Sequence, residues 1–169
     1  MNLESFYRVS YSSENELCKN NNLLKKHIIS DKTMEFNRYE AIISQNERCF
    51  CGIKYYDHGL KPQIITITGK DIFYIAFNRI IAGCNYLTKK TIFIKELPSL
   101  FFELIQVTSD IYVIICEMDA CAIDSKGEIF WTVGFKDIVS DYCVQGNVLN
   151  IKCDDGDESS IDILSGSLL

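Results

Sequence analysis

An internal repeat constrains the fold of this 169-residue chain more than any other feature. Three stretches align with one another, and each has a polar residue in front of an apolar run. That place is taken by Asp71, Asp110 and Asn147, which are 39 and 37 residues apart. A nearly constant period of this length indicates a single supersecondary unit that recurs and stacks on its neighbours.

Two further matches follow almost the same spacing. Residues 91–97 (TIFIKEL) align with residues 128–135 (EIFWTVGF), and residues 122–124 align with residues 160–162. Because several points match at similar offsets, the repeat extends over whole units rather than over one short motif.

The composition of each unit is that of β-strands joined by tight turns. Residues 71–81 and 110–118 are rich in Ile, Val, Tyr and Phe, which suit a pleated surface. Turn-forming residues follow at 124–127 and 154–157, where glycine can adopt a positive φ. We therefore expect hairpins throughout this part of the chain.

The segment DIYVIICEMDACAIDSKGEIFW, followed by NVLNIKCDDGDESSIDILSG, resembles the quinoprotein-type β-propeller repeat. The shared pattern is a strand, a turn, an Ile-Asp pair, a Gly turn and an aromatic-rich strand ending at Trp131. The resemblance covers about residues 71–169 and implies blade-like sheets without implying quinone chemistry. Because propellers need roughly four or more blades and fewer than three units are recognisable, it predicts an open propeller-like meander or a sandwich.

The N-terminal segment, residues 1–36, has a different pattern. Ser13 and Glu16 have the spacing of a capping box, which predicts a helix from about residue 14 to about residue 29. Leu17, Leu24 and Ile28 form its apolar stripe. Strands resume at residue 38, so we expect one mainly β or α+β domain over residues 1–169, with a β-rich repeat region over 38–169.

Stacking of the repeat units predicts a single shared core. Its expected members occupy equivalent or alternating places in the units: Trp131, Ile129, Ile111, Val113, Ile115, Phe73, Ile75 and Ile151. Four cysteines of the same region are also expected in the core: Cys116, Cys121, Cys143 and Cys153.

Cysteine and histidine are the side chains most able to carry chemistry here. Cys49 and Cys51 have C-x-C spacing, with Asp57 and His58 close behind, so these four form the alternative candidate for a ligand, metal or catalytic site. Alternation along a strand would place both cysteines on one face, where cysteine usually packs as a small buried hydrophobe. No glycine-rich phosphate loop, G-x-S-x-G or H-E-x-x-H motif is present, so we expect no enzyme activity, cofactor or metal.

The net charge of −6 is unevenly distributed along the chain. Residues 1–109 carry +3 and residues 110–169 carry −9. This acidity disfavours nucleic-acid binding, and is either a solvated surface or a docking face for a basic partner. The candidate contacts lie in turns or near strand ends: Asp137, Asp141, Asp154, Asp155, Asp157 and Glu158. We assign Asp124 and Asp162 to turn capping instead.

Size, charge and the missing motifs favour a protein-binding module. The most specific hypothesis is an immunity protein that neutralises a cognate bacterial toxin, such as a basic nuclease, through an acidic face. The alternative is a β-domain with a site around Cys49, Cys51, Asp57 and His58. Neither a signal peptide nor an apolar run of roughly 18 residues is recognisable, so we expect a cytoplasmic protein with reduced thiols and no membrane partner.

Overall fold

The computed structural model describes residues 7–32, 37–43, 48–67 and 69–169. Four parts of the segments discussed above lie outside these ranges: residues 1–6, residues 33–36, residues 44–47 and Thr68. In the described part of the chain, the first sheet is formed by strands in the order β1 (Tyr7–Tyr11), β3 (Asn37–Ile43), β4 (Cys49–Tyr56) and β2 (Ile28–Ser30). All of its pairings are antiparallel except that of β2 with β4.

The repeat region forms three further antiparallel sheets from consecutive strands. The second sheet contains β5 (Gln63–Thr66), β6 (Ile72–Phe77), β7 (Ile80–Asn85) and β8 (Lys90–Glu96). The third sheet contains β9 (Phe101–Gln106), β10 (Tyr112–Cys116), β11 (Asp119–Ile123) and β12 (Ile129–Gly134). The fourth sheet contains β13 (Val139–Gln145), β14 (Val148–Cys153) and β15 (Glu158–Asp162). The predicted mainly β, propeller-like fold is confirmed.

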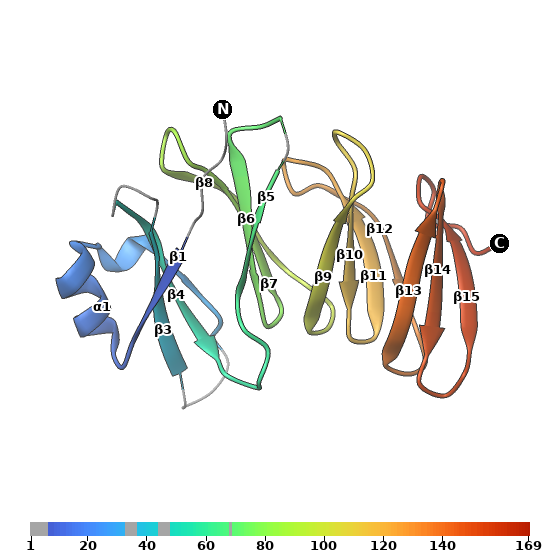
Figure 1. Ribbon diagram of the computed structural model, residues 1–169, viewed down its shortest axis with the longest axis horizontal. Coiled ribbons are helices and arrows are strands. Elements are labelled where there is room, and N and C mark those ends of the chain that lie inside the picture. The colour runs from blue at the N-terminus through green and yellow to red at the C-terminus, as the bar shows by residue number, and fades with distance from the viewer. Residues whose placement is uncertain (1–6, 33–36, 44–47, 68) are drawn as a thin grey trace.

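The four sheets stand in a row, face to face, like adjacent blades (Figure 1). The helix α1 (Glu14–Asn21) lies at one end of the row, against the outer face of the first sheet. The fourth sheet lies at the other end, beside the C-terminus. The arrangement is an open arc, as the small number of repeat units predicted.

The apolar side chains form separate layers between neighbouring sheets, so the prediction of one shared core is wrong. Phe73 and Ile75 lie between the first and second sheets, whereas Val113 and Ile115 lie between the third and fourth. The central strands of a stacked sheet are buried on both faces, and equivalent positions therefore contact different neighbours. Ile129 is 41% exposed and belongs to none of the buried layers.

The register confirms the repeat. Phe73 pairs with Cys84 in the second sheet, and Tyr112 pairs with Ile123 in the third. The pair equivalent to these in the fourth sheet is Leu149 with Ile161. In all three sheets the first residue of the pair faces the preceding sheet, which explains why the aligned residues share an apolar character.

The helix α1 is shorter than expected. Ser13 caps it as predicted, because its Oγ accepts a hydrogen bond from the Glu16 N–H at 3.2 Å, and Leu17 is fully buried. The helix ends at Asn21, since Asn22 adopts a left-handed conformation with φ of 51°. Asparagine is a poor helix former but tolerates this conformation. Ile28, expected on the helix, begins strand β2 instead.

The two aspartates assigned to turn capping do cap turns. Asp124 Oδ1 accepts hydrogen bonds from the Lys126 and Glu128 N–H groups, both at 2.8 Å. Asp162 Oδ1 accepts from the Ser165 N–H, also at 2.8 Å. Among the described residues, no helix has the length and apolar character needed to cross a membrane.

Candidate functional site

All six candidate acidic residues lie at one end of the fourth sheet. Its register pairs Asp141 of β13 with Lys152 of β14, and Lys152 with Glu158 of β15. Beyond the next pair, Val139 with Cys153, the chain forms the loop entering β13 and the β14–β15 turn. Those two segments hold the remaining four candidates: Asp137, Asp154, Asp155 and Asp157. We call these six residues, with the backbone that carries them, the acidic end.

Backbone hydrogen bonds fix the loop that enters β13. The Asp154 N–H donates to the Ile138 carbonyl oxygen at 2.9 Å, which ties this loop to the β14–β15 turn. The Val139 N–H donates to the Glu117 carbonyl oxygen at 2.8 Å, which ties the same loop to the β10–β11 turn of the third sheet. The acidic end therefore rests on two sheets.

Few cations balance the acidic end. Residues 136–169 contain seven carboxylates and two lysines. Lys136 forms an ion pair with Asp157 at 3.6 Å, and Lys152 forms one with Glu158 at 3.7 Å. All four of these side chains are more than half exposed, and such surface pairs contribute little to stability. A net negative surface remains available to a cationic partner.

One buried thiol lies close to the acidic end. The pKa of Cys153 is raised chiefly by its burial, and the negative charges of Asp155 and Asp157 add to this effect. A backbone hydrogen bond with Asp137 acts in the opposite direction.

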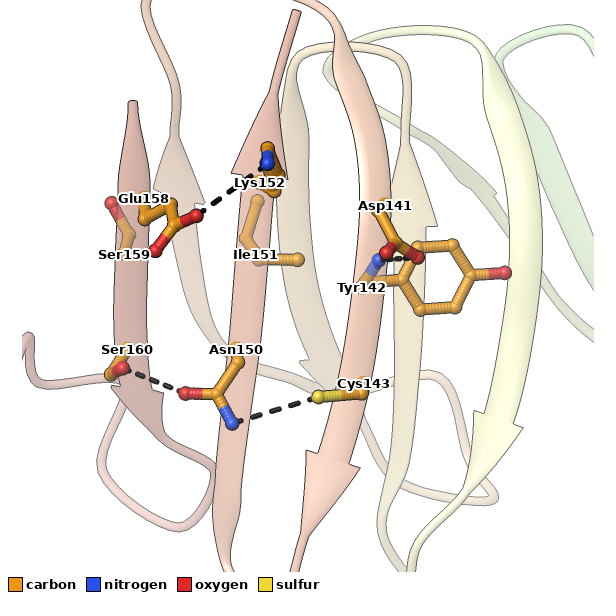
Figure 2. Close-up of a pocket in the computed structure, with 9 residues that line it drawn as sticks. All are labelled: Asp141, Tyr142, Cys143, Asn150, Ile151, Lys152, Glu158, Ser159 and Ser160. Atoms are coloured by element: carbon orange, nitrogen blue, oxygen red, sulfur yellow. Dashed lines mark hydrogen bonds and ion pairs between the residues drawn. The ribbon is translucent and has the colours of Figure 1, made fainter. Parts of the chain in front are cut away.

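The outer face of the fourth sheet is polar and slightly hollowed. Figure 2 shows side chains from β13, β14 and β15 around a cavity of about 330 Å³. Asn150 accepts a hydrogen bond from Ser160 at 2.7 Å and donates to the Cys143 sulfur at 3.8 Å. The ion pair between Lys152 and Glu158 closes the other end of the hollow.

Cys143 is exposed on this face, so its predicted core position is wrong. Cys116, Cys121 and Cys153 are buried as expected. The difference arises from an irregularity between Val139 and Asp141, where β13 gains one residue relative to β14. Such a bulge reverses the alternation of side chains beyond it, and Cys143 therefore lies on the outer face.

Exposed apolar residues that no sequence pattern singled out flank the acidic end. Met118 and Ile138 are 38% and 39% exposed. Their segments adjoin, because the Phe135 N–H donates to the Met118 carbonyl oxygen at 2.8 Å. A second hollow of about 210 Å³ lies nearby, lined in part by Cys153 and Asp157. The sequence feature that could have indicated these two residues is an apolar side chain placed in an otherwise polar turn.

The alternative site around the C-x-C motif is not assembled. Cys49 is the first residue of β4, and Asp57 and His58 follow the last. At about 3.3 Å per residue, an eight-residue strand separates them by more than 20 Å. Asp57 instead pairs with Arg38 at 2.7 Å, and His58 Nε2 hydrogen-bonds Asn78 Oδ1 at 2.8 Å.

The two cysteines of that motif also face different layers. Cys51 lies between the first and second sheets, whereas Cys49 packs beside Leu17 under α1. Their pairing skips Phe50, since Cys51 is opposite Ile42 and Cys49 is opposite the next residue. This bulge, rather than simple alternation, decides where the two thiols lie. Within the described ranges, His, Cys, Asp and Glu form no cluster suited to a metal ion.

Comparison with solved structures shows a propeller-like fold. The computationally designed Ika8 protein matches with a TM-score of 0.54 and 15% identity, over 82% of this chain and 46% of its own. Apo AztD from Citrobacter koseri matches with a TM-score of 0.53 and 16% identity, over 85% and 45%. The WD40 β-propeller domain of Doa1 matches with a TM-score of 0.51 and 12% identity, over 80% and 50%.

The chain therefore spans half or less of the length of these three proteins. No protein-family model and no curated protein matches its sequence. At these identities the similarity shows the fold alone. The chain has a β-propeller-like architecture, and the quinoprotein type of its repeat stays a prediction.

Proposed function

We propose that this protein is an interaction module that binds a basic protein partner through the acidic end. The observation that carries the proposal is that strand pairing brings Asp137 and Asp141 to the same end of the terminal sheet as the four acidic residues within 154–158. Carboxylates gathered on one surface steer a cationic partner towards it and repel partners of the wrong charge.

The neighbouring surface has the composition of an interface. Met118 and Ile138 provide exposed apolar area, and the carboxylates surround it. Protein interfaces typically combine an apolar centre with a polar rim. The row of Asp141, Lys152 and Glu158 would also allow an arginine of the partner to bind a carboxylate in bidentate fashion.

The most specific form of the proposal is an immunity protein that neutralises a cognate bacterial toxin in the cytoplasm. A toxin that cleaves RNA or DNA needs a basic cleft for phosphate groups. An acidic inhibitor surface would occupy that cleft and associate quickly. In this role the protein itself would need no catalytic group, which agrees with the expectation that it is not an enzyme.

Affinity capture from the native host tests the proposal. The test variant carries Asp154→Asn and Asp155→Asn, which keep side-chain size and remove two charges of the acidic end. The matched control carries Glu96→Gln and Glu128→Gln, two exposed carboxylates of the second and third sheets.

A basic protein retained by the wild type and the control, but lost with the test variant, is the expected result. Co-expression with that protein should relieve its toxicity if it is a toxin. Equal retention by all three proteins, or a partner that is acidic, would contradict the proposal.

A further inference from the structure

The fourth sheet has one strand fewer than the second and third sheets. In those two sheets a fourth strand, β8 or β12, lies along the outer edge, whereas in the fourth sheet β15 is itself the edge strand. Among the described residues, only 167–169 lie along this edge, next to the C-terminus in Figure 1. The place of a fourth strand is therefore only partly filled.

The hydrogen bonds of β15 locate the part of its edge that stays free. The Asp162 N–H donates to the Ser167 carbonyl oxygen at 2.9 Å. The Leu169 N–H donates to the Ser160 carbonyl oxygen, also at 2.9 Å. Backbone groups alternate between the two sides of a strand, so Glu158 is the next residue with its N–H and carbonyl turned to this edge. Neither group of Glu158 has a backbone partner within the described ranges.

The equivalent residues of the other two repeat units are paired. Ile81 of β7 is opposite Lys95 of β8. Ala120 of β11 is opposite Val133 of β12. Like Glu158, Ile81 and Ala120 lie three positions before the second residue of the pair that is equivalent in the three sheets. Glu158 thus marks the position at which the fourth sheet lacks its outer strand.

The two faces beside this free edge differ in chemistry. Ser159 faces the third sheet, at the hollow of about 210 Å³ that Val133, Phe135 and Leu168 also line. Glu158 lies on the opposite, outer face, and its side chain is 71% exposed (Figure 2). A strand added here places every second side chain at a partly apolar hollow, and the side chains between them beside a carboxylate.

We propose that the basic partner binds by adding an extended strand to the free edge of β15, with basic residues alternating with apolar ones. The inference rests on the proposed function and specifies how the partner docks. In this mode main-chain hydrogen bonds supply affinity, and alternate side chains supply specificity. The added strand displaces residues 167–169, where Leu168 and Leu169 are 66% and 74% exposed and little buried apolar area is lost.

A second copy of this chain and the other free edges fit less well. Pairing of β15 with its own copy would bring two Glu158 carboxylates close together, and like charges on paired strands are destabilising. The strands β8 and β12 are edge strands too, but a bulge lies along the pairing of each, and bulges disfavour the addition of a further strand. Lys90 and Lys95 of β8 would also repel a basic segment.

Synthetic peptides test this mode of binding on the full chain. The probe is a heptapeptide of alternating lysine and valine with both ends blocked. In the expected register its lysines are opposite Glu158 and Ser160, so that the lysine N–H groups face β15. N-methylation of the lysine residues should weaken binding at least about tenfold, because these hydrogen bonds are lost. N-methylation of the valine residues is the matched control, and should leave binding unchanged.

Variants of the protein test the other side of the same hydrogen bonds. Glu158→Pro removes the outward N–H at an edge position, where a strand tolerates proline, and should weaken binding more than the matched control Glu158→Gln. Deletion of residues 167–169 should tighten binding by about threefold or more, because the peptide then displaces nothing. Binding should also slow the exchange of the amide hydrogens of Glu158 and Ser160.

The proposal is overturned if the unmodified peptide gives no saturable binding up to about 1 mM. Equal binding of the two methylated peptides would overturn it too, since the surface would then recognise charge alone. Slowed exchange confined to β8 or β12 would place the added strand elsewhere and have the same consequence. These outcomes leave the proposed function standing, because that function fails only if capture from the native host yields no basic partner that depends on Asp154 and Asp155.

Discussion

Among single residues, Trp131 links two neighbouring sheets of the repeat region. Its side chain is 8% exposed, and its indole N–H donates to the Ile163 carbonyl oxygen at 2.7 Å. The residue thereby joins the last strand of the third sheet to the segment after β15. We expect Trp131→Ala to lower the free energy of unfolding by about 3–5 kcal/mol.

The neighbouring residue provides the control for this substitution. Phe130 is 54% exposed, so Phe130→Ala should change the free energy of unfolding by about 0.5 kcal/mol or less. Urea titrations of both variants make the comparison. Equal shifts in the two midpoints would show that the buried indole contributes no more to stability than the exposed phenyl ring.

Stability should also depend on pH in the alkaline range. Burial raises the pKa of Cys49 from its ordinary value of 9.0 to about 11, and the pKa of Tyr55 from 10.0 to about 12. Both groups are neutral when protonated, and their folded pKa values exceed the unfolded ones. Their contribution is thus complete below pH 9 and is lost as the pH rises towards 12.

The urea midpoint should consequently fall between about pH 9 and about pH 10.5. Cys49→Val removes one of the groups whose pKa is raised, and should flatten the decline. A midpoint that stays constant over this range in the wild type would show that these two groups ionise as they do in the unfolded chain.

The contrast between Cys153 and Cys143 shows what can be predicted for a residue. Cys153 is buried as expected, and along β14 it alternates with the buried Leu149 and Ile151. Cys143 has a similar strand environment in the sequence, but a bulge two to four residues earlier turned it outwards. A bulge is one extra residue in a ladder, and local composition does not reveal which strand carries it.

At the scale of elements, one turn glycine packs against the preceding sheet and another does not. Gly127 has φ of +83°, and a Cβ there would lie 2.4 Å from Cγ of Phe93 in the preceding sheet. Gly146 has φ of +62°, with nothing within 4 Å of the same position. Both glycines adopt a left-handed backbone conformation, but only Gly127 packs closely against another side chain.

We expect Gly146→Ala to cost about 1 kcal/mol, which is the strain of the left-handed conformation. Gly127→Ala should cost about 1–3 kcal/mol more, because Phe93 must move. Urea unfolding of the two variants measures the difference. Identical costs would mean that the β11–β12 turn does not press on the second sheet.

Strand positions were predictable from the repeat, but the alignment of the outermost strands was not. The sequence alignment of the two segments starts by matching Thr91 with Glu128, and it therefore aligns Phe93 with Phe130. In the structure Phe93 pairs with Gly83, and Trp131 pairs with Ala122, so these two aromatic residues are equivalent. Both sheets have a bulge at the same place, so the shift comes from the hairpin turn: residues 85–90 separate the paired Cys84 and Thr91, whereas only residues 124–128 separate Ile123 and Ile129.

At the scale of the molecule, each predicted repeat unit corresponds to one sheet, and the sheets stand in a row. The row explains why one predicted core became several layers, since the two faces of a central sheet contact different neighbours. The net charge of −9 over residues 110–169 does not by itself indicate which surface of the fold carries it. The antiparallel order of β13, β14 and β15 gathers six of those carboxylates at one end.

A polar cleft of the first sheet, lined in part by Arg8, Glu40 and Tyr55, was not predictable for a related reason. These residues are far apart in the sequence, and three different strands bring them together. The capping box of α1 was visible because all of its residues are local. Local patterns thus identified the elements, while the composition of each surface followed from strand order.

The most direct test of the acidic end is the association rate of the captured partner, measured by stopped flow. Salt should be varied from about 0.01 M to about 1 M, which shortens the Debye length from about 30 Å to about 3 Å. Replacing Asp154, Asp155, Asp157 and Glu158 by their amides should slow association and weaken its dependence on salt, with little change in dissociation. Association by wild type and variant at the same rate at every salt concentration would contradict the assignment of this surface.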